Sequence, residues 1–371
     1  MVQARAKRIF TNLQQTGGEE VDVIVLMNAV APHVDLSFFH VTDLVEGGVF
    51  ERSAAFLYPD GKVEILTAPL EEESARKAPE ATVHLFENPE QKRAFFEERV
   101  KGKRVGIHPT ELTYADYEIL RRYVDGGRIV DAGKAIERAR LVKDRLELER
   151  MQKAADIATK VADGIPQMLT DGLTEKELAA EINYKMQKLG ASGASFDTIV
   201  GFGPGSAEPH YHPMNVKLTK GHFVLTDFGA WYNKYASDIT RTYLYGRVSE
   251  EHKAVYETVL RAQEAAIAAM KPGAKAGDVH KAADDVINAS KWKGRFIHST
   301  GHSLGLAVHD GGVLHPRYDL TLEEGMVFTI EPGIYVPGFG GVRIEDDAVI
   351  TQNGCRLLTS AKKRIEDVTC G

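Results

Sequence analysis

The chain has 371 residues, of which 43% are hydrophobic, so it is long enough to form two domains with a core in each. It carries 46 Lys and Arg against 53 Asp and Glu, which gives a formal net charge of -7. Nucleic acid is excluded as an expected partner, because phosphate binding needs clustered cations and the sequence has no dense basic block.

The sequence also has no apolar run of the length and continuity that a signal peptide or a membrane span requires. The two cysteines, Cys355 and Cys370, provide neither a disulfide framework nor a Cys-x-x-Cys metal site. We therefore expect a cytoplasmic protein with no membrane partner.

The first third of the chain alternates strand-like and helical patterns. Apolar runs at residues 21–28, 53–66 and 103–109 predict strands, and the middle run contains a Pro-Asp-Gly turn. Residues 68–80 and 88–100 have helical spacing and charged faces. This alternation predicts a small α/β domain.

The pattern changes around residues 131–143. The sequence from residue 131 to residue 169 lacks strand character and is rich in Ala, Leu, Glu, Lys and Arg, which favour helices. We place the domain boundary here, which gives an N-terminal domain of residues 1–137 and a second domain of residues 138–371.

A further helix is predicted to begin at Thr174, with Glu177 completing a capping box, and to end at Gly190. The glycine-rich residues 201–206 resemble a nucleotide-binding loop only in part. Because Pro204 and the residues after it do not open a helix, a nucleotide-binding enzyme is the less favoured interpretation.

Residues 226–246 read as two strands joined by a tight turn, with Asp227 and Asp238 inside them. A turn centred between Tyr232 and Asn233 would make the two aspartates direct cross-strand neighbours, with Cβ atoms roughly 4.5 to 5.5 Å apart. Like charges in that position destabilise a sheet, and burial without a partner costs more. The pair indicates a bound cation, unless the hairpin is simply exposed to solvent.

A second acidic pair arises near the C-terminus. Glu331 and Glu345 are equidistant from Gly338, which lies in a loop between two apolar runs. A hairpin centred on Gly338 would therefore place the two glutamates opposite one another. Two acidic pairs on apolar strands are hard to explain as surface decoration.

Three histidines lie between the hairpins, His298, His302 and His309. Two histidines four residues apart can bind metal from one helix face, but Gly301 and Gly305 make a helix improbable here. Only one of the pair His298 and His302 need be a ligand.

Two Asp, two Glu and one His form an oxygen-rich, thiol-free set that can hold two divalent cations. Ligand softness favours Mn, Co or Zn, with Fe as a further choice, over Cu(I) or an iron–sulfur cluster. Ions about 3.5 to 4 Å apart share bridging carboxylates and lower the pKa of a bound water.

The five residues, each in its own local sequence and in this order, resemble the ligand set of the pita-bread metallopeptidases: Asp227, Asp238, His302, Glu331 and Glu345. That family includes Xaa-Pro dipeptidase (prolidase), aminopeptidase P, methionine aminopeptidase and non-peptidase relatives. The likeness covers residues 140 to 360. The N-terminal third is similar to the creatinase-like domain of prolidases and aminopeptidases P, which methionine aminopeptidases lack. The resemblance implies an α/β (α+β) protein with a creatinase-like domain followed by a pita-bread catalytic domain.

The resemblance also implies roles for the metal ligands. Asp227 and Asp238 bind one ion, His302 helps to bind the other, and Asp238, Glu331 and Glu345 hold the pair together. Glu331 is the candidate acceptor of the nucleophile's proton.

Other positions match residues that bind substrate in the family. His210, seventeen residues before Asp227, and His309 would bind substrate and stabilise the tetrahedral intermediate. His298, Arg343 and Tyr335 would line the same site. His212 is an extra histidine without an assigned role. Ser303 stands where many relatives have Gly. Aromatic and small apolar residues around Phe202, Tyr211 and Tyr335 are candidates to recognise a proline ring.

The expected activity is dinuclear-metal-dependent hydrolysis of the peptide bond that precedes proline, with Xaa-Pro dipeptides as the leading substrates. An aminopeptidase P that acts on longer Xaa-Pro peptides is the alternative within the class, and the compact length favours prolidase. A non-catalytic binding protein that keeps the fold is the alternative outside it, although the intact ligand set favours a hydrolase. By resemblance we also expect a homodimer.

Overall fold

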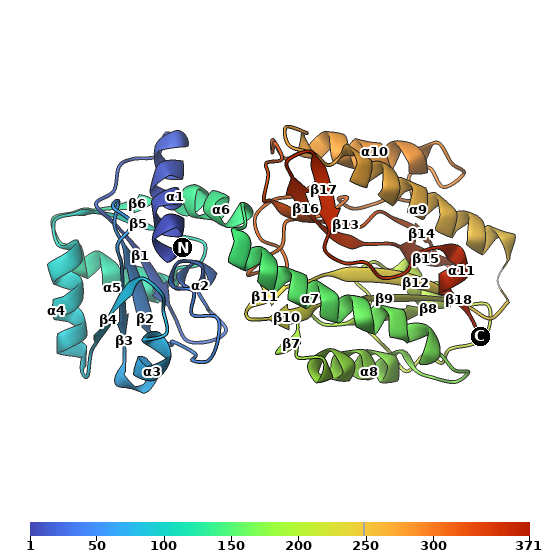
Figure 1. Ribbon diagram of the computed structural model, residues 1–371, viewed down its shortest axis with the longest axis horizontal. Helices are drawn as coiled ribbons and strands as arrows, with labels where there is room; N and C mark the ends of the chain where they lie inside the picture. Colours follow the sequence, from blue (N-terminus) through green and yellow to red (C-terminus); the bar gives the residue numbers. More distant parts are fainter. Residues whose placement is uncertain (248) are drawn as a thin grey trace. The chain divides into compact units, whose positions relative to one another are not determined.

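The computed structural model describes residues 1–247 and 249–371. The chain divides into two compact units, which we call the N-terminal unit (Met1–Arg140) and the C-terminal unit (Leu141–Gly371) (Figure 1). The predicted boundary between residues 137 and 138 falls within helix α6 (Gly133–Leu141). Both units mix helices and strands, which confirms the predicted fold class.

The N-terminal unit is built on a six-stranded mixed sheet with the order β4-β3-β2-β1-β5-β6. Strand β1 pairs antiparallel with β2 and parallel with β5. The strands are β1 (Val23–Asn28), β2 (Ser53–Leu57), β3 (Val63–Thr67), β4 (Ala81–Leu85), β5 (Arg104–Ile107) and β6 (Arg128–Asp131). The helices are α1 (Val2–Gln15), α2 (Leu36–Thr42), η1 (Pro69–Glu71), α3 (Glu72–Ala75), α4 (Pro89–Val100), α5 (Tyr114–Tyr123) and α6.

The core of this unit explains which predicted elements form. Phe96 and Val100 of α4 and Leu120 of α5 pack with buried residues of the central strands. The predicted strands are confirmed, and α4 confirms the helix at residues 88–100. The helical pattern at residues 68–80 forms only over Pro69–Ala75, as η1 followed by α3, and the helix ends there. The sequence pattern misses β4 and β6 because they are the sheet edges and are only partly buried.

The C-terminal unit contains several small sheets, the largest with the order β18-β12-β9-β8. Helices α9 and α10 lie on one side of its strands and α8 on the other (Figure 1). The helices are α7 (Arg145–Gly164), η2 (Ile165–Gln167), α8 (Glu175–Lys188), η3 (Gly203–Ala207), α9 (Glu250–Ala269), α10 (Ala276–Asn288) and α11 (Ile365–Val368). The strands are β7 (Gly193–Ala194), β8 (Ile199–Phe202), β9 (Phe223–Phe228), β10 (Ala230–Tyr232), β11 (Tyr235–Ala236), β12 (Ile239–Tyr245), β13 (Val327–Ile330), β14 (Gly333–Val336), β15 (Gly340–Arg343), β16 (Asp346–Thr351), β17 (Gly354–Leu357) and β18 (Thr369–Cys370).

Helix α8 has the predicted N-terminus. Thr174 accepts a hydrogen bond from Glu177 N, and Glu177 accepts one from Thr174 N, so the capping box is confirmed. Residues 201–206 run from the end of β8 into the short η3 and do not open an α-helix. This geometry agrees with the poor match to a dinucleotide-binding loop.

The first acidic hairpin has a different register from the predicted one. Asp227 of β9 pairs with Thr240 of β12, not with Asp238. The turn is formed by Asn233 and Lys234, with φ of 47° and 61°. Two central residues with positive φ are what the tightest hairpin turns need, and Asn tolerates that conformation. Asp238 lies two residues before the partner of Asp227, and an offset of two keeps both carboxylates on one face.

The second hairpin has the predicted register. Gly333 pairs with Arg343 across β14 and β15, and Ile330 pairs with Asp346 across β13 and β16. Both pairings centre on Gly338, which has a φ of 79°. Glu331 and Glu345 therefore occupy opposite positions in the short break between the two strand pairs.

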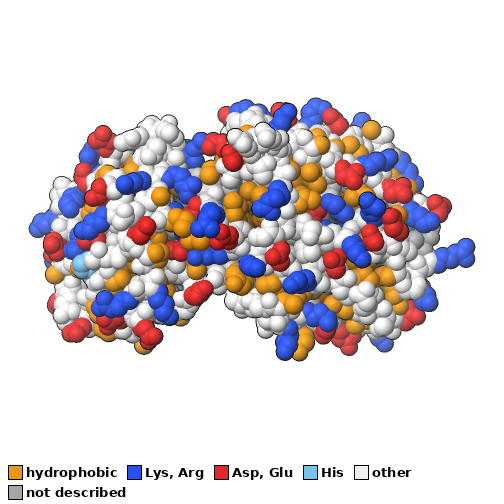
Figure 2. Space-filling view, in the orientation of Figure 1, with side chains coloured by type: hydrophobic (Ala, Val, Ile, Leu, Met, Phe, Trp, Pro, Cys, Tyr) orange, Lys and Arg blue, Asp and Glu red, His pale blue; other side chains and the backbone are white. Residues whose placement is uncertain are grey.

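The surface carries both signs of charge. On the face drawn in Figure 2, Lys and Arg side chains are interspersed with Asp and Glu. Among the helices of the described chain, none combines the length and the apolar character that crossing a bilayer would take.

Candidate metal centre

One strand, three breaks between strands and one loop bring the acidic and imidazole side chains together. Asp227 is near the end of β9, and Asp238 lies between β11 and β12. Glu331 follows β13, and Glu345 lies between β15 and β16. His302 comes from an irregular segment, as the glycines beside it indicate. The interrupted strands let Asp238, Glu331 and Glu345 leave their sheets and face the same space as Asp227.

This space is a cavity of about 730 Å³. All five predicted metal ligands line it, together with His210, His298, His309 and Arg343. Tyr335 is not part of the lining, but its hydroxyl contacts Arg343 and His298. The apolar part of the wall consists of Phe196, Ile199, Pro209, Ile297 and Val308.

Asp238, His302 and Glu345 each offer a ligand atom within 4.8 Å of the others. His302 Nε2 lies 3.6 Å from Asp238 Oδ2 and 3.5 Å from Glu331 Oε1. Asp227 Oδ1 and Asp238 Oδ1 are buried without a hydrogen-bond partner among the described residues. Buried carboxylate oxygens of this kind need a cation or a donor, so the residues present fit a divalent metal.

The ionisation of these groups also suits a cation site. Burial raises the pKa of Asp238 well above its ordinary range, and repulsion from Glu345 adds to the effect. Burial and the charge of Glu331 do the same to the pKa of Glu345. Burial raises the pKa of Glu331 to about 7, although Arg343 opposes the shift. A bound cation would remove the cause of the repulsion.

His302 and His309 pack closely, with ring centroids 4.1 Å apart and planes at 89°. Burial lowers the pKa of His302 to about 3, and burial also lowers the pKa of His309. His302 is therefore a neutral imidazole over the whole physiological range, which is the form that binds metal.

Arg343 connects the acidic groups to the rest of the wall. Its Nη2 donates to Asp227 Oδ2 over 2.6 Å, and its Nε donates to Thr240 Oγ1 over 3.0 Å. Thr240 Oγ1 in turn donates to Glu345 Oε2 over 2.6 Å. The Tyr335 hydroxyl accepts from Arg343 Nη1 over 2.7 Å and lies 2.9 Å from His298 Nε2. One guanidinium thus orients two of the carboxylates.

Comparison with known proteins agrees with this geometry. Residues 149–352 match metallopeptidase family M24, and residues 15–142 match the creatinase/prolidase N-terminal domain. The chain belongs to metallopeptidase family M24. The resemblance inferred from the ligand set is thereby confirmed.

Some of the similar proteins cover nearly the whole chain. The Xaa-Pro dipeptidase of Pyrococcus furiosus is 35% identical over 337 residues, which are 91% of this chain and 94% of the relative. The structure of the Xaa-Pro dipeptidase from Bacillus anthracis covers 100% of both chains with 29% identity and a TM-score of 0.88. The X-Pro aminopeptidase from Thermotoga maritima MSB8 covers 95% of this chain and 99% of its own, with 28% identity and a TM-score of 0.87.

Some candidate residues of this M24 chain lie away from the cavity. Phe202 is 1% exposed in the hydrophobic core, and the Tyr211 hydroxyl donates to Glu175 Oε2 over 3.1 Å. Neither ring lines the cavity, and recognition of proline by the residues around them stays a prediction. His212 is exposed, Ser303 is buried, and neither lines the cavity.

Two threonines of the M24 site have no signal in the sequence. Thr240 holds Glu345, while Thr329 Oγ1 accepts from His302 N over 3.0 Å and donates to Glu331 Oε1 over 3.3 Å. Threonine is an ordinary strand residue, so its presence in β12 and β13 indicates nothing by itself. Only the pairing of distant strands shows what these hydroxyls contact.

Proposed function

We propose that this chain is a metal-dependent peptidase that cleaves the bond preceding proline, with Xaa-Pro dipeptides as its leading substrates. The observation that carries the proposal is the convergence of five metal-ligand side chains from separate segments on one cavity. Membership of the M24 family supports the hydrolytic class, and the names of the P. furiosus and B. anthracis relatives support the substrate.

We assign two divalent ions, Mn, Co or Zn, to the predicted ligand set of Asp227, Asp238, His302, Glu331 and Glu345. When bound, such a pair supplies a water of lowered pKa and polarises the scissile carbonyl. Residues 138–371 would form the catalytic domain, and residues 1–137 the creatinase-like domain. The homodimer, the cytoplasmic location and the absence of nucleic-acid and membrane partners stay predictions.

The remaining residues of the wall would handle protons and substrate. Glu331 would take the proton of the attacking water, because its carboxylate lines the cavity and lies 3.5 Å from His302 Nε2. His210 and His309 would stabilise the developing oxyanion, and Arg343 with Tyr335 and His298 would orient the groups around them.

The substrate side of the cavity must accept a tertiary amide, which has no N–H to donate. An apolar wall suits that requirement. Phe196, Ile199 and Val308, which line the cavity, would contact the proline ring and the side chain of the first residue.

The test is an assay of metal-stripped protein on Ala-Pro and Ala-Pro-Ala after loading with Mn²⁺, Co²⁺ or Zn²⁺. We expect release of free proline from Ala-Pro and dependence on the added ion. Failure to cleave either peptide, with any of the ions, would contradict the proposal.

The second candidate is an aminopeptidase P, which the structural likeness to the T. maritima X-Pro aminopeptidase supports. A kcat/KM higher for Ala-Pro-Ala than for Ala-Pro would favour it. Metal analysis tests the remaining alternative, a non-catalytic binding protein. Fewer than one ion per chain after Mn²⁺ or Co²⁺ loading would favour it.

A further inference from the structure

Consecutive residues of β12 contact Glu345 in two different ways. Thr240 donates its hydroxyl to the Glu345 carboxylate, and Arg241 donates from Nη1 to the Glu345 backbone carbonyl. Successive side chains of a strand point to opposite faces, so Thr240 lies on the cavity side and Arg241 behind it. Glu345 N also donates to Thr240 O over 3.1 Å. This dipeptide therefore holds both the side chain and the main chain of one metal ligand.

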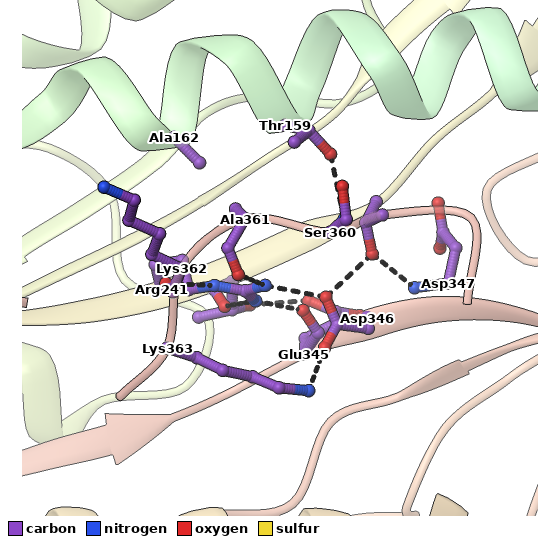
Figure 3. Close-up of polar contacts among 12 residues, drawn as sticks. Thr159, Ala162, Arg241, Glu345, Asp346, Asp347, Ser360, Ala361, Lys362 and Lys363 are labelled. Atoms are coloured by element: carbon purple, nitrogen blue, oxygen red, sulfur yellow. Dashed lines mark hydrogen bonds and ion pairs between the residues drawn. The ribbon is translucent and has the colours of Figure 1, made fainter. Parts of the chain in front are cut away.

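All three nitrogens of the Arg241 guanidinium donate hydrogen bonds. Its side chain is 0% exposed, and Nη2 pairs with Asp346 Oδ1 at 2.7 Å (Figure 3). Its other acceptors are backbone carbonyls. Besides that of Glu345, they are Thr240 O at 3.0 Å, Ala361 O at 2.8 Å and Lys362 O at 3.2 Å. A planar, five-donor group fits such a set, whereas a lysine ammonium does not.

The carbonyls of Ala361 and Lys362 belong to a segment that we call the C-terminal clamp, Thr359–Lys363. Helix α7 holds this clamp, since Ser360 N donates to Thr159 Oγ1 over 3.1 Å and Lys362 N donates to Asp163 Oδ1 over 2.9 Å. Residues of α7, which are far from β12 in the sequence, therefore hold the clamp and with it the guanidinium of Arg241.

The same network reaches a second metal ligand. Thr359 Oγ1 donates to Asp346 Oδ1 over 2.8 Å and accepts from Asp347 N over 3.0 Å. Asp347 Oδ2 then accepts from Asp238 N over 3.0 Å. Lys363 Nζ donates to Asp346 Oδ2 over 2.6 Å and completes the surroundings of that carboxylate. The backbones of Glu345 and Asp238 are therefore tied to one set of side chains behind the site.

We propose that Arg241 is a positioning residue for the metal centre and that the C-terminal clamp sets its orientation. The proposal rests on the metal assignment made above. Four carboxylates that repel one another keep a productive geometry only if their backbones are fixed. Arg241 fixes the backbone of Glu345 from the face of β12 opposite the cavity. Groups that orient metal ligands from outside the coordination shell typically change metal affinity about 10- to 100-fold.

The test compares Arg241→Lys with wild type in equilibrium dialysis of metal-stripped protein against Co²⁺ or Mn²⁺. The substitution keeps the positive charge but removes most of the hydrogen bonds that the guanidinium makes. A loss of metal affinity would therefore reflect the lost orientation of Glu345 and not a change of charge. We expect a loss of metal affinity of about tenfold or more. Arg5→Lys is the matched control, because Arg5 is 1% exposed and pairs with Asp43 in the N-terminal unit. It should lower the melting temperature and leave metal affinity unchanged.

A second variant serves where Arg241→Lys fails to fold. Thr359→Val keeps the shape and charge of the clamp but removes the hydroxyl between Asp346 and Asp347, and we expect it to weaken metal binding as well. Of Arg241→Lys and Thr359→Val, if every variant that folds binds metal with wild-type affinity, the proposal is overturned. A loss of affinity in Arg5→Lys as large as in the test variants would overturn it too, since general destabilisation would then explain both. Wild-type protein that binds no divalent ion would instead contradict the proposed function.

Discussion

Arg343 and Tyr335 share a hydrogen bond of 2.7 Å, and this bond links the acidic side of the cavity to its imidazole side. The guanidinium also donates to Asp227, while the phenol oxygen lies 2.9 Å from His298 Nε2. Burial raises the pKa of Tyr335 to about 12, so the phenol stays protonated and can act as a donor. Removing the hydroxyl therefore separates the two sides without touching a metal ligand.

Tyr335→Phe tests this link. We expect kcat/KM for Ala-Pro to fall about tenfold, because each lost hydrogen bond to a charged group is worth about 1.5 to 3 kcal/mol and His298 loses its fixed orientation. Metal content should stay near that of wild type, since Arg343 still holds Asp227. Kinetics and metal analysis of the same preparation check both points, and a variant that loses metal would show that the phenol supports the ligands instead.

Asp238→Ala should abolish hydrolysis of Xaa-Pro dipeptides and strongly reduce metal binding. The carboxylate has an oxygen buried without a partner and lies beside His302 and Glu345, so its loss leaves the remaining acids without a shared ion. Asp319→Ala is the control, because the Asp319 side chain is 94% exposed and pairs only with a surface lysine in the described contacts. Retained activity of Asp238→Ala in metal-replete buffer would contradict the ligand assignment.

The stability of the metal-free chain should fall as pH rises. Burial raises the pKa of Glu331 from 4.5 to about 7, so the folded state holds a proton that the unfolded state has released. Its contribution is complete below pH 4.5 and is lost as the pH approaches 7. We expect the melting temperature of stripped protein to drop across this window, and added Co²⁺ or Mn²⁺ to reverse the drop.

Glu331→Gln provides the comparison, because the amide is similar in shape and does not ionise. The difference in melting temperature between the two stripped proteins should change between pH 4.5 and 7, since only wild type loses the stability that this proton provides. If the melting temperatures of the two stripped proteins change in parallel between pH 4.5 and 7, the raised pKa of Glu331 is not the cause of the pH dependence.

Much of the site was predictable because its residues sit in local patterns. The second hairpin follows from a glycine-rich loop, which placed Glu331 and Glu345 correctly. The first hairpin turns at Asn233 and Lys234, and without a glycine there the centre is hard to locate. The aspartates still face the same way, because a register change of two residues preserves the side of the strand.

The parts that sequence could not provide depend on contacts across long separations. Thr240 and Glu345 are 105 residues apart, and Arg241 and Ala361 are 120 residues apart. Nothing in the local sequence of β12 marks its threonine and arginine as partners of a glutamate in another hairpin. The edge strands β4 and β6 were missed for a related reason, since partial burial leaves no apolar pattern to detect.

His210→Ala should lower turnover and leave metal content near normal. His210 lines the cavity but is exposed, and its ligand atoms are not part of the compact group formed by Asp238, His302 and Glu345. Removing a donor that faces the developing oxyanion typically costs about 10²- to 10³-fold in kcat. Kinetics with Ala-Pro and metal analysis decide the role, and loss of metal would make His210 a ligand.

Glu208→Gln should change the preference for the first residue of the substrate. Of the described carboxylates that line the cavity, Glu208 alone lies outside the predicted ligand set, and its side chain is exposed. Because bound cations would neutralise the other acids, the exposed Glu208 carboxylate is a separate negative charge that a basic first residue can meet. We expect kcat/KM for Lys-Pro relative to Leu-Pro to fall about two- to fivefold in the variant, the usual size of an exposed ion pair. The effect should shrink at high salt. If kcat/KM for Lys-Pro and for Leu-Pro changes equally in the variant, Glu208 does not interact with the side chain of the first residue.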